Sequence, residues 1–362
     1  MQMALELAAR ALGRTTPNPP VGAVVVSNGR VVGEGFHPAA GQPHAEILAL
    51  RSAENYTRGS ELYVTLEPCC HHGRTGPCTE AIIAAGIHRV IVGCLDPNPK
   101  VSGQGLKRLR DSGIRVTYGI LEPDCQRLIS PFAKHVTAGM PYVVYKAAMS
   151  LDGQTATSNG ESQWISSSES RHHVHRLRDQ VDAILVGSAT VIADNPRLTT
   201  RLFSGGRNPL RIVVDSQLIT HPNAAVYDDR VAPGSVIVTS NHHPASRLEP
   251  YRKPSLEIIQ VDEIDGRLNL LSAMKAIAAK NIQFILLEGG SSLAGAMLRA
   301  GLIDRIMFYL APIMFGGNNG RMVFDGPGIE CLRDAYRLTD LRVSRIEEDF
   351  LVEGEVARCS QD

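Results

Sequence analysis

His44-Ala45-Glu46, followed by Pro68-Cys69 and then Cys78, is the part of the sequence that decides the fold and chemistry expected of the first half of the chain. One imidazole and two thiolates are a donor set that suits zinc, and three protein ligands leave one tetrahedral position open. A carboxylate beside such a metal can move protons without binding it. The pattern predicts the zinc site of a hydrolytic deaminase, in which the metal lowers the pKa of bound water and the glutamate transfers the protons.

Spacing alone leaves the thiolate ligands open, because Cys69 and Cys70 are adjacent. Cys70 or one of the two histidines after it would close the site as a structural zinc site by supplying a fourth ligand. Pro68 favours Cys69, because the deaminase signature has a proline directly before its first cysteine. Eight residues separate Cys69 from Cys78, and this gap, wider than in the signature, indicates a particular branch of the deaminases. A third alternative is that these are unrelated buried residues. It would require both motifs to occur by chance in the right order and near the right separation.

The spacing of His44 and Glu46 also constrains the local backbone. Residues two apart on a helix point about 200° away from each other, so the two side chains can converge only where a helix begins. Pro43 stands directly before His44, and proline begins helices more readily than it continues them. We therefore expect a helix that starts near His44.

Length, charge and cysteine content limit the class of protein. The chain has 362 residues, more than one hydrophobic core usually supports, so two domains are expected. Its net charge is zero, and the first 140 residues have only a small basic excess, so nucleic acid is not an expected partner. Seven cysteines, an odd number, indicate a reducing compartment and a cytoplasmic location.

The N-terminal residues do not have the pattern of a signal peptide. Glu6 and Arg10 interrupt the apolar run of residues 1–12, which is typical of an amphipathic helix. No apolar stretch elsewhere approaches the length that crosses a membrane, so a membrane is not an expected partner.

The first 140 residues alternate strands and helices. Strands are expected at residues 21–26, 31–35, 62–66, 90–94 and 115–118, and helices at 5–12, 44–53, 79–85, 104–112 and 124–135. Such alternation predicts a layered α/β domain whose ligands lie at the ends of strands and helices. The zinc motifs all fall at those ends.

A glycine and proline break at residues 137–141 marks the expected domain boundary. Beyond it, strands are expected at residues 142–149, 183–186, 211–214, 236–239, 257–261, 284–287 and 305–310, with a helix at 270–279. The alternation again indicates α/β structure with a mainly parallel sheet. No G-x-G-x-x-G follows a strand, so a standard Rossmann site is not indicated. The run from Leu286 to Gly295 passes from a strand through paired glycines into a helix, which suits either phosphate binding or plain turn chemistry.

Further motifs accompany these features in both halves. They are Thr16-Pro17-Asn18-Pro19-Pro20-Val21-Gly22, Gly33-Glu34-Gly35-Phe36-His37, Thr65-Leu66-Glu67-Pro68-Cys69, Gly73-Arg74-Thr75-Gly76-Pro77-Cys78, Asp96-Pro97-Asn98-Pro99, Lys146-Ala147-Ala148-Met149-Ser150-Leu151-Asp152-Gly153, Gly160-Glu161-Ser162-Gln163-Trp164-Ile165 and Asp194-Asn195-Pro196-Arg197-Leu198-Thr199, besides Glu288-Gly289-Gly290. With these motifs the chain closely resembles the bifunctional riboflavin biosynthesis deaminase-reductases over essentially its whole length.

The resemblance implies two α/β domains with successive activities. Residues 1–140 would form a cytidine-deaminase-like three-layer domain that uses zinc to deaminate 2,5-diamino-6-(5-phosphoribosylamino)pyrimidin-4(3H)-one. Residues 141–362 would form a dihydrofolate-reductase-like domain that uses NADPH to reduce the ribosyl side chain of the product to ribityl. NADPH carries the hydride, so the reductase domain needs no metal. A homo-oligomer acting on a small phosphorylated molecule is expected.

The resemblance also assigns residues to roles. In the deaminase domain the zinc ligands fall on His44, Cys69 and Cys78, the proton-transferring carboxylate on Glu46, and the remaining pocket residues on Asn18, His37, His71 and Arg74. In the reductase domain the substrate contacts fall on Ser162, Arg178, Leu198, Arg201 and Glu288. The cofactor contacts fall on Ala148, Trp164, Thr190, Asp194, Ser216, Gly290, Ser291, Ser292, Leu293, Ala294, Gly295 and Ala296.

Within this assignment the arginines suit phosphate, because a guanidinium fork binds phosphate oxygens in pairs. Lys146 and Asp152 are charged residues expected near the reacting ribose. Cys70 stands where a small polar residue is expected, which makes it an alternative ligand or an oxidation partner of Cys69.

Two other functions remain to be compared with this one. A single-activity nucleoside or tRNA deaminase with an accessory domain would explain only the first 140 residues, and the weak basic excess and wide cysteine gap disfavour it. A zinc-structured binding module would have no use for the carboxylate of Glu46.

Overall fold

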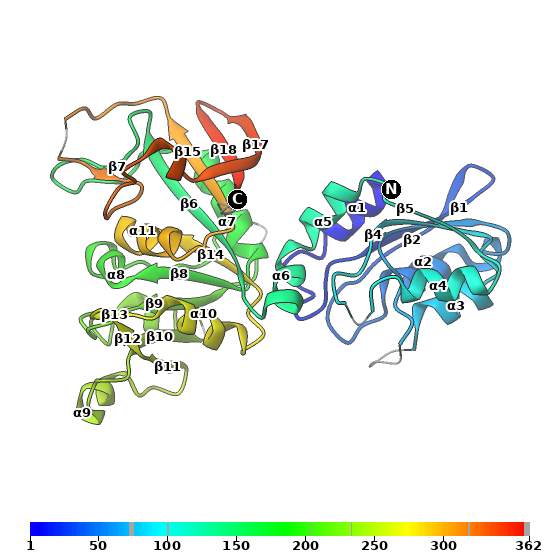
Figure 1. Ribbon diagram of the computed structural model, residues 1–362, viewed down its shortest axis with the longest axis horizontal. Helices are drawn as coiled ribbons and strands as arrows, with labels where there is room; N and C mark the ends of the chain where they lie inside the picture. Colours follow the sequence, from blue (N-terminus) through cyan, green and yellow to red (C-terminus); the bar gives the residue numbers. More distant parts are fainter. Residues whose placement is uncertain (72–75, 100, 204, 233, 318, 358–362) are drawn as a thin grey trace. The chain divides into compact units, whose positions relative to one another are not determined.

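The computed structural model describes residues 1–71, 76–99, 101–203, 205–232, 234–317 and 319–357, and it divides into two compact units (Figure 1). These units are Met1–Met140 and Pro141–Asp362. Each unit has its own α/β sheet, so the expected two-domain α/β organisation is confirmed.

The N-terminal unit is built on a five-stranded sheet with the order β2-β1-β3-β4-β5. The strands are β1 (Gly22–Ser27), β2 (Arg30–Phe36), β3 (Glu61–Leu66), β4 (Arg89–Cys94) and β5 (Arg115–Tyr118). The helices are α1 (Gln2–Ala9), α2 (Ala45–Ala53), α3 (Cys78–Ala84), α4 (Gln104–Asp111), α5 (Glu122–Leu128) and α6 (Ser130–Ala138), and the short 3-10 turn η1 spans Glu54–Tyr56. Strands β3, β4 and β5 are parallel, whereas β1 pairs antiparallel with both of its neighbours.

Helices cover both faces of this sheet. Successive side chains of β1 pack alternately against one helix and the other. Val25 packs in one apolar cluster with Ala49 of α2, while its neighbour Val24 packs in another with Leu7 of α1. Successive residues of a strand point to opposite faces, so α2 and α1 lie on opposite sides of β1. Gly35 lets α2 approach closely, because a Cβ at that position would lie 2.4 Å from the carbonyl oxygen of Ala45. The unit is therefore three-layered.

The single helix expected at residues 124–135 is wrong. Two helices, α5 and α6, replace it and meet at Ile129, which has φ −100° and ψ 7°. Pro131 lies in the first turn of α6. Proline has no N–H to continue a helix and its ring clashes with the preceding turn, so the chain starts a new helix there.

The C-terminal unit is built on a nine-stranded sheet with the order β11-β10-β9-β8-β14-β6-β15-β18-β17. The strands are β6 (Tyr142–Ser150), β8 (Ala183–Gly187), β9 (Leu210–Val214), β10 (Ser235–Ser240), β11 (Leu256–Val261), β14 (Phe284–Glu288), β15 (Arg305–Ala311), β17 (Arg337–Ile346) and β18 (Asp349–Ala357). The seven strands from β11 to β15 are mutually parallel, as expected. Strands β18 and β17, which the sequence did not predict, extend the sheet as an antiparallel pair.

Smaller elements complete this unit. Its helices are α7 (Ser168–Gln180), α8 (Ser188–Asp194), α9 (Ala245–Leu248), α10 (Leu270–Ala278) and α11 (Ser291–Arg299), and its 3-10 turns are η2 (Ala225–Tyr227), η3 (Glu249–Tyr251) and η4 (Leu332–Asp334). Two short ribbons pair β7 (Gln154–Ala156) with β16 (Arg321–Met322), and β12 (Glu263–Ile264) with β13 (Arg267–Leu268). None of the helices in the described ranges has both the length and the apolar character that crossing a membrane requires.

One buried carboxylate fixes the loops at the carboxyl edge of the N-terminal sheet. Glu67, which follows β3 and is 4% exposed, accepts four backbone N–H bonds. The donors are Asp96 at 3.2 Å, Gly103 at 2.9 Å, Gly105 at 2.8 Å and Leu106 at 3.3 Å. The carboxylate thus ties the segment before Cys69 to the loop after β4 and to the first turn of α4.

We expect Glu67→Gln to destabilise the N-terminal unit by about 2 kcal/mol, because the new amide NH₂ would face backbone donors and leave them without an acceptor. Glu80→Gln is the control, since Glu80 is exposed and pairs with Arg108 at the surface, and this substitution should change the unfolding free energy by less than about 1 kcal/mol. Urea unfolding measures both variants. Equal unfolding free energies for them would contradict a structural role of the Glu67 bonds.

Candidate metal centre and active sites

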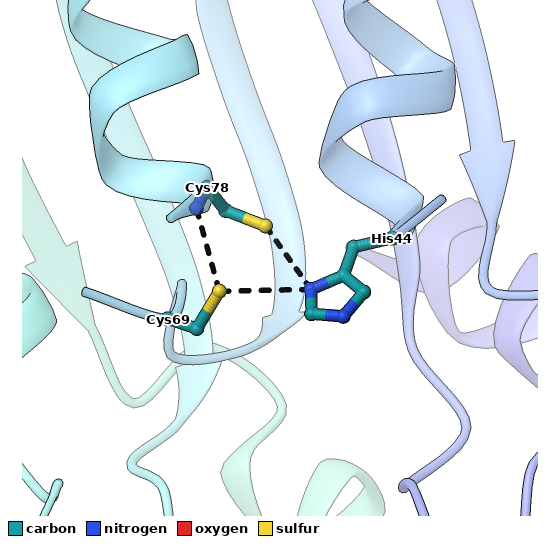
Figure 2. Close-up of side chains that lie close together, drawn as sticks. All are labelled: His44, Cys69 and Cys78. Atoms are coloured by element: carbon teal, nitrogen blue, oxygen red, sulfur yellow. Dashed lines mark hydrogen bonds between the residues drawn. The ribbon is translucent and has the colours of Figure 1, made fainter. Parts of the chain in front are cut away.

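His44, Cys69 and Cys78 meet at the ends of three different segments (Figure 2). His44 is the residue that caps α2, with an extended backbone at φ −70° and ψ 161°, and Cys78 is the first residue of α3. Cys69 lies in the loop after β3. The helix begins directly after His44, as expected, so His44 and Glu46 are not held on opposite sides of one continuous helix.

The three ligand atoms have the spacing that a tetrahedral zinc site requires. The Nδ1 atom of His44 lies 3.2 Å from Sγ of Cys78 and 3.6 Å from Sγ of Cys69, and all three atoms lie within 4.8 Å of one another. Ordinary Zn–S and Zn–N bond lengths at tetrahedral angles put nitrogen and sulfur ligands roughly 3.6 Å apart. Cys70 does not belong to this cluster. The residues present therefore fit zinc, and the sulfur of Cys69, not that of Cys70, lies in the cluster.

The pKa values of the two thiols in the cluster shift in opposite directions. The pKa of Cys69 is lowered to about 4, chiefly by hydrogen bonding from Cys78 and also by His44, against the opposing effect of burial. The backbone N–H of Cys78 also points at the Cys69 sulfur, 3.3 Å away. The pKa of Cys78 is correspondingly raised, first by its bond to Cys69. One ligand is therefore already a thiolate, the form that binds a metal.

Glu46 is the proton-transferring candidate, and its side chain is buried at the metal-binding cluster. It lies in the first turn of α2 and is 3% exposed. Burial raises the pKa of Glu46 to about 7, and the negative charge of Cys69 contributes. A carboxyl group that titrates near neutral pH can both accept and donate a proton under physiological conditions.

His37 orients Asn18 rather than serving as a free cation. Its Nδ1 lies 3.2 Å from the carbonyl oxygen of Pro43, which can only accept, so Nδ1 carries the proton. Burial lowers the pKa of His37, which keeps the ring neutral, and Nε2 must then accept a bond. The Nδ2 group of Asn18, 3.0 Å away, supplies that bond and leaves its Oδ1 to accept from a ligand.

The two remaining residues expected in the deaminase pocket, His71 and Arg74, follow Cys69 in the sequence. His71 is exposed. Burial raises the pKa of Asp96, and His71 opposes that rise. The two residues are therefore near each other, which brings the loop after β4 close to the segment that follows Cys69. Arg74 lies outside the described residues.

The C-terminal unit contains a cavity of about 1130 Å³ at the carboxyl ends of its parallel strands. All the substrate contacts expected in this unit line it, as do ten of the cofactor contacts: Ala148, Trp164, Thr190, Asp194, Ser216, Gly290, Ser291, Ser292, Leu293 and Ala296. Ala294 and Gly295 are not among the lining residues. Ala294 is fully buried, and a Cβ on Gly295 would lie 1.9 Å from the carbonyl oxygen of Asp325, so these two residues pack α11 onto its neighbours.

Arg178 and Glu288 form a buried pair in the wall of this cavity. The Nε and one terminal nitrogen of Arg178 lie 2.8 Å and 2.7 Å from the two carboxylate oxygens. Its other terminal nitrogen donates to the carbonyl oxygen of Thr199 at 3.0 Å. Burial would raise the pKa of Glu288, but Arg178 outweighs it and the net shift is downward. Most donors of Arg178 are thereby occupied, so it mainly holds Glu288 in position.

Arg197 and Arg201 are better placed than Arg178 to bind a phosphate. Both line the cavity. Burial lowers the pKa of Arg201, and the positive charges of Arg178 and Arg197 lower it further, so three cations are close together. An anion in the cavity would relieve that repulsion. The sequence motif Asp194–Thr199 contains Arg197, but nothing in the sequence showed that it lies beside Arg201 in the cavity.

Lys146 and Asp152, both expected near the reacting ribose, have different environments. The Lys146 side chain lines the cavity, and its Nζ lies 5.6 Å from the centre of the Tyr309 ring. Burial lowers the pKa of Lys146, against the opposing effect of Glu288. Asp152 does not line the cavity. Its oxygens accept bonds from Ser150, Gln154 and the backbone of residues 315–316, so it holds two loops together.

Comparison with known proteins covers both units. Residues 1–94 match the family described as the cytidine and deoxycytidylate deaminase zinc-binding region, and residues 141–352 match the RibD C-terminal domain. The riboflavin biosynthesis protein RibD of Synechocystis sp. is 40% identical over 362 residues, covering 100% of this chain and 96% of that protein. RibD of Escherichia coli is 42% identical over 356 residues, covering 94% and 95%.

Two solved structures resemble the chain along nearly its whole length. One is a diaminohydroxyphosphoribosylaminopyrimidine deaminase/5-amino-6-(5-phosphoribosylamino)uracil reductase from Thermotoga maritima. It has a TM-score of 0.87 at 37% identity and covers 99% of this chain and 97% of that one. The other is Acinetobacter baumannii RibD, with a TM-score of 0.84 at 35% identity over 99% and 98% of the two chains.

The ligand assignment makes a direct prediction. We expect Cys70→Ser to retain about one zinc per chain, because Cys70 is not part of the metal-binding cluster. We expect Cys69→Ser to retain far less, because it removes the thiolate ligand. Metal analysis of both purified proteins measures this difference. Zinc retained by Cys69→Ser and lost from Cys70→Ser would reverse the assignment.

Proposed function

The chain belongs to the RibD family of riboflavin biosynthesis proteins, and we propose that it converts one phosphorylated pyrimidine in two successive steps. It is a bifunctional enzyme with a zinc-binding deaminase domain and a reductase domain. The first step removes the 2-amino group of 2,5-diamino-6-(5-phosphoribosylamino)pyrimidin-4(3H)-one by hydrolysis. The second uses NADPH to reduce the ribosyl side chain of the product to ribityl. The spacing of His44, Cys69 and Cys78 carries the deaminase half of this proposal.

In the deaminase domain, the metal ligands, Glu46 and Asn18 have different roles. Zinc held by His44 and the two cysteines would supply a Lewis acid that makes water nucleophilic at neutral pH. Glu46 accepts one proton from the attacking water and donates it to the ring nitrogen, and it then transfers the second proton of that water to the departing ammonia. Its pKa of about 7 suits both directions of transfer. Asn18, fixed by His37, presents an amide oxygen to an N–H group of the pyrimidine.

In the reductase domain, the cavity wall supplies charge and position. NADPH, when bound, supplies the hydride. Arg201 and Arg197 hold the substrate phosphate, since their charges repel each other without an anion. Opening of the ribosyl ring requires a proton on the ring oxygen. Lys146 is a partly buried residue that lines the cavity, and we assign it that proton. Arg178 keeps Glu288 ionised beside Lys146.

The deaminase mechanism predicts the behaviour of one variant. Glu46→Gln should keep its zinc but lose deamination by about 10²-fold or more, because an amide cannot accept the proton. The ultraviolet spectrum of the diaminopyrimidine substrate follows this step. The matched control is Glu34→Gln, which alters an exposed residue of β2 and should leave both zinc and activity unchanged.

The same variant tests the order of the two steps. With the diamino substrate, Glu46→Gln should not oxidise NADPH, and addition of the deaminated compound should restore oxidation. Oxidation of NADPH with the undeaminated compound would show that reduction comes first. Normal deamination by Glu46→Gln would remove Glu46 from the mechanism.

We further propose that the chain forms a homo-oligomer through the edge strand β17. Leu338, Leu341 and Val343 are 39%, 57% and 62% exposed on this strand, and Phe350 of β18 is 43% exposed beside it. An edge strand with this many exposed apolar residues is prone to pair with another chain. A second copy of this chain is always present in a solution of the protein, and most soluble oligomers are homo-oligomers.

Light scattering after size exclusion tests this proposal. The unsubstituted chain should have the mass of at least two chains, and Leu341→Glu should reduce that mass, because a buried unpaired carboxylate is costly. Leu332→Glu is the control, because Leu332 is 85% exposed outside β17. A monomeric unsubstituted chain, or an unchanged mass for Leu341→Glu, would contradict this interface.

We also propose a reducing, cytoplasmic location. Cys69, Cys70, Cys78, Cys94, Cys125 and Cys331 are all free thiols. A zinc site that depends on thiolates persists where thiols stay reduced.

A further inference from the structure

We propose that Tyr309 is a positioning residue of the reductase unit, which holds the ammonium group of Lys146 against its ring and is itself held in place by His173. The inference rests on the proposed role of Lys146 as the donor of a proton to the substrate. Neither Tyr309 nor His173 lines the cavity, so both would act through Lys146 and not on the substrate directly.

The register of the strands brings Lys146 and Tyr309 to the same face of the sheet. Lys146 of β6 is level with Glu288 of β14 on one side and with Met307 of β15 on the other. Tyr309 lies two residues beyond Met307 and therefore points to the same face as Met307. The Tyr309 ring is thus the diagonal neighbour of Lys146, a distance that an aromatic ring and a long side chain can bridge.

The ring is the contact that directs the end of the Lys146 side chain. Its Nζ atom lies 5.6 Å from the centre of the Tyr309 ring, within the range of a cation–π interaction. Across the described part of the chain, this Nζ forms no hydrogen bond and no ion pair. The oxygens of Glu288 are bonded to Arg178 instead. A flexible lysine stem without such bonds takes its direction from the surface it rests on, which here is the Tyr309 ring.

His173 of α7 holds the Tyr309 ring by its hydroxyl group. Nδ1 of His173 lies 2.6 Å from the Tyr309 oxygen, and the Tyr309 side chain is fully buried. A buried phenol needs a hydrogen-bond partner of this kind. Burial raises the pKa of Tyr309, so the group stays an uncharged phenol at neutral pH. The bond therefore fixes where the ring lies beside Lys146.

The first turn of α7 is tied to the strand that pairs with β15. Asp349, at the start of β18, is fully buried. It accepts bonds from the backbone N–H of Ser167 at 2.8 Å and from the hydroxyl of Ser170 at 2.5 Å. β18 pairs with β15, which carries Tyr309. His173 thus belongs to a helix whose start is fixed beside the tyrosine that it holds.

The charged groups around Lys146 come from β14 and from α7. Burial lowers the pKa of Lys146, Glu288 of β14 opposes that effect, and Arg178 of α7 adds to it. The face of an aromatic ring is negative, so the Tyr309 ring also favours the protonated amine. A proton donor must carry its proton, so reduction should slow as the pH rises through the pKa of Lys146. Removal of the ring should lower that pKa and move the decline in rate to lower pH.

His173 adds no charge to this site near neutral pH. Burial lowers the pKa of His173, and Arg176 of the same helix lowers it too, against Glu353 of β18 and Glu169 of α7. Its titration therefore lies on the acidic side, whereas the decline assigned to Lys146 lies on the alkaline side. One pH profile of the rate distinguishes the two groups.

Reduction of the deaminated substrate by the full chain, followed at a series of pH values, tests the inference. Tyr309→Leu should lower kcat by about tenfold or more, because Nζ is no longer held toward the substrate. Its alkaline decline should move to lower pH by roughly half a unit. KM for NADPH should change by less than about twofold, because Tyr309 does not line the cavity. Tyr56→Leu, at a residue that is 65% exposed in the N-terminal unit, is the control and should match the unsubstituted chain.

Two further variants test the bond between His173 and Tyr309 without removing the ring. Tyr309→Phe and His173→Ala should each lower kcat by about threefold. The double variant should be no slower than the slower single variant, because both substitutions remove the same bond. Thermal unfolding shows which variants are folded, and these milder ones decide the inference where Tyr309→Leu does not fold.

Three results would overturn the inference in distinguishable ways. An unchanged kcat and pH profile in folded Tyr309→Leu, or an unchanged kcat in both milder variants, would exclude Tyr309 from positioning Lys146 and leave the proposed reductase function intact. Losses that multiply in the double variant would show that His173 does not act through Tyr309. Undiminished reduction by Lys146→Met would refute the proposed proton donor itself, and the inference with it.

Discussion

Parallel pairing of strands is the constraint on which both sites depend. Parallel strands run in the same direction, so their carboxyl ends meet at one edge of the sheet and their following loops lie side by side. In the C-terminal unit this brings Glu288, Lys146 and Ser216, which are far apart in sequence, to one cavity. In the N-terminal unit the loops after β3 and β4 carry Cys69 and Asp96 to the same edge.

Carboxylates hold the loops at these edges. Glu67 and Asp215 are buried, and they accept four backbone bonds and fix the turn after β9, respectively, whereas the half-buried Asp152 joins two loops of the C-terminal unit. Glu288 differs from them because it faces the cavity and is held by Arg178. An acidic residue in a site motif of this chain therefore has either a chemical or a structural task. Its hydrogen-bond partners distinguish the two, and the motif alone does not.

The sequence predicted structural features that depend on residues close to one another along the chain. The start of α2 at His44 follows from Pro43 and from the two-residue spacing to Glu46, and the structure has that start. The break between α5 and α6 follows equally from Pro131 and was nonetheless missed. Strands β17 and β18 carry no motif, and their residues lack the clear alternation of a sheet with one buried face.

The contacts that assign roles within the second site join distant segments. Arg178 and Glu288 are 110 residues apart, and only the folded sheet shows that they neutralise each other. The sequence suggested that both belong to one site. It could not show that Glu288 and Thr199 occupy most of the donors of Arg178, or that Ala294 and Gly295 pack a helix while their neighbours line the cavity.

The two helix starts at the metal-binding cluster have an electrostatic consequence. α2 begins after His44 and α3 begins at Cys78, so both helices direct their amino ends at the same three side chains (Figure 2). Each helix amino end acts roughly as half a positive charge, and together they offset much of the charge of one thiolate. The backbone thus stabilises the anionic ligand before any cation arrives. The cluster can stay assembled in the metal-free protein, so loss of zinc need not unfold the domain.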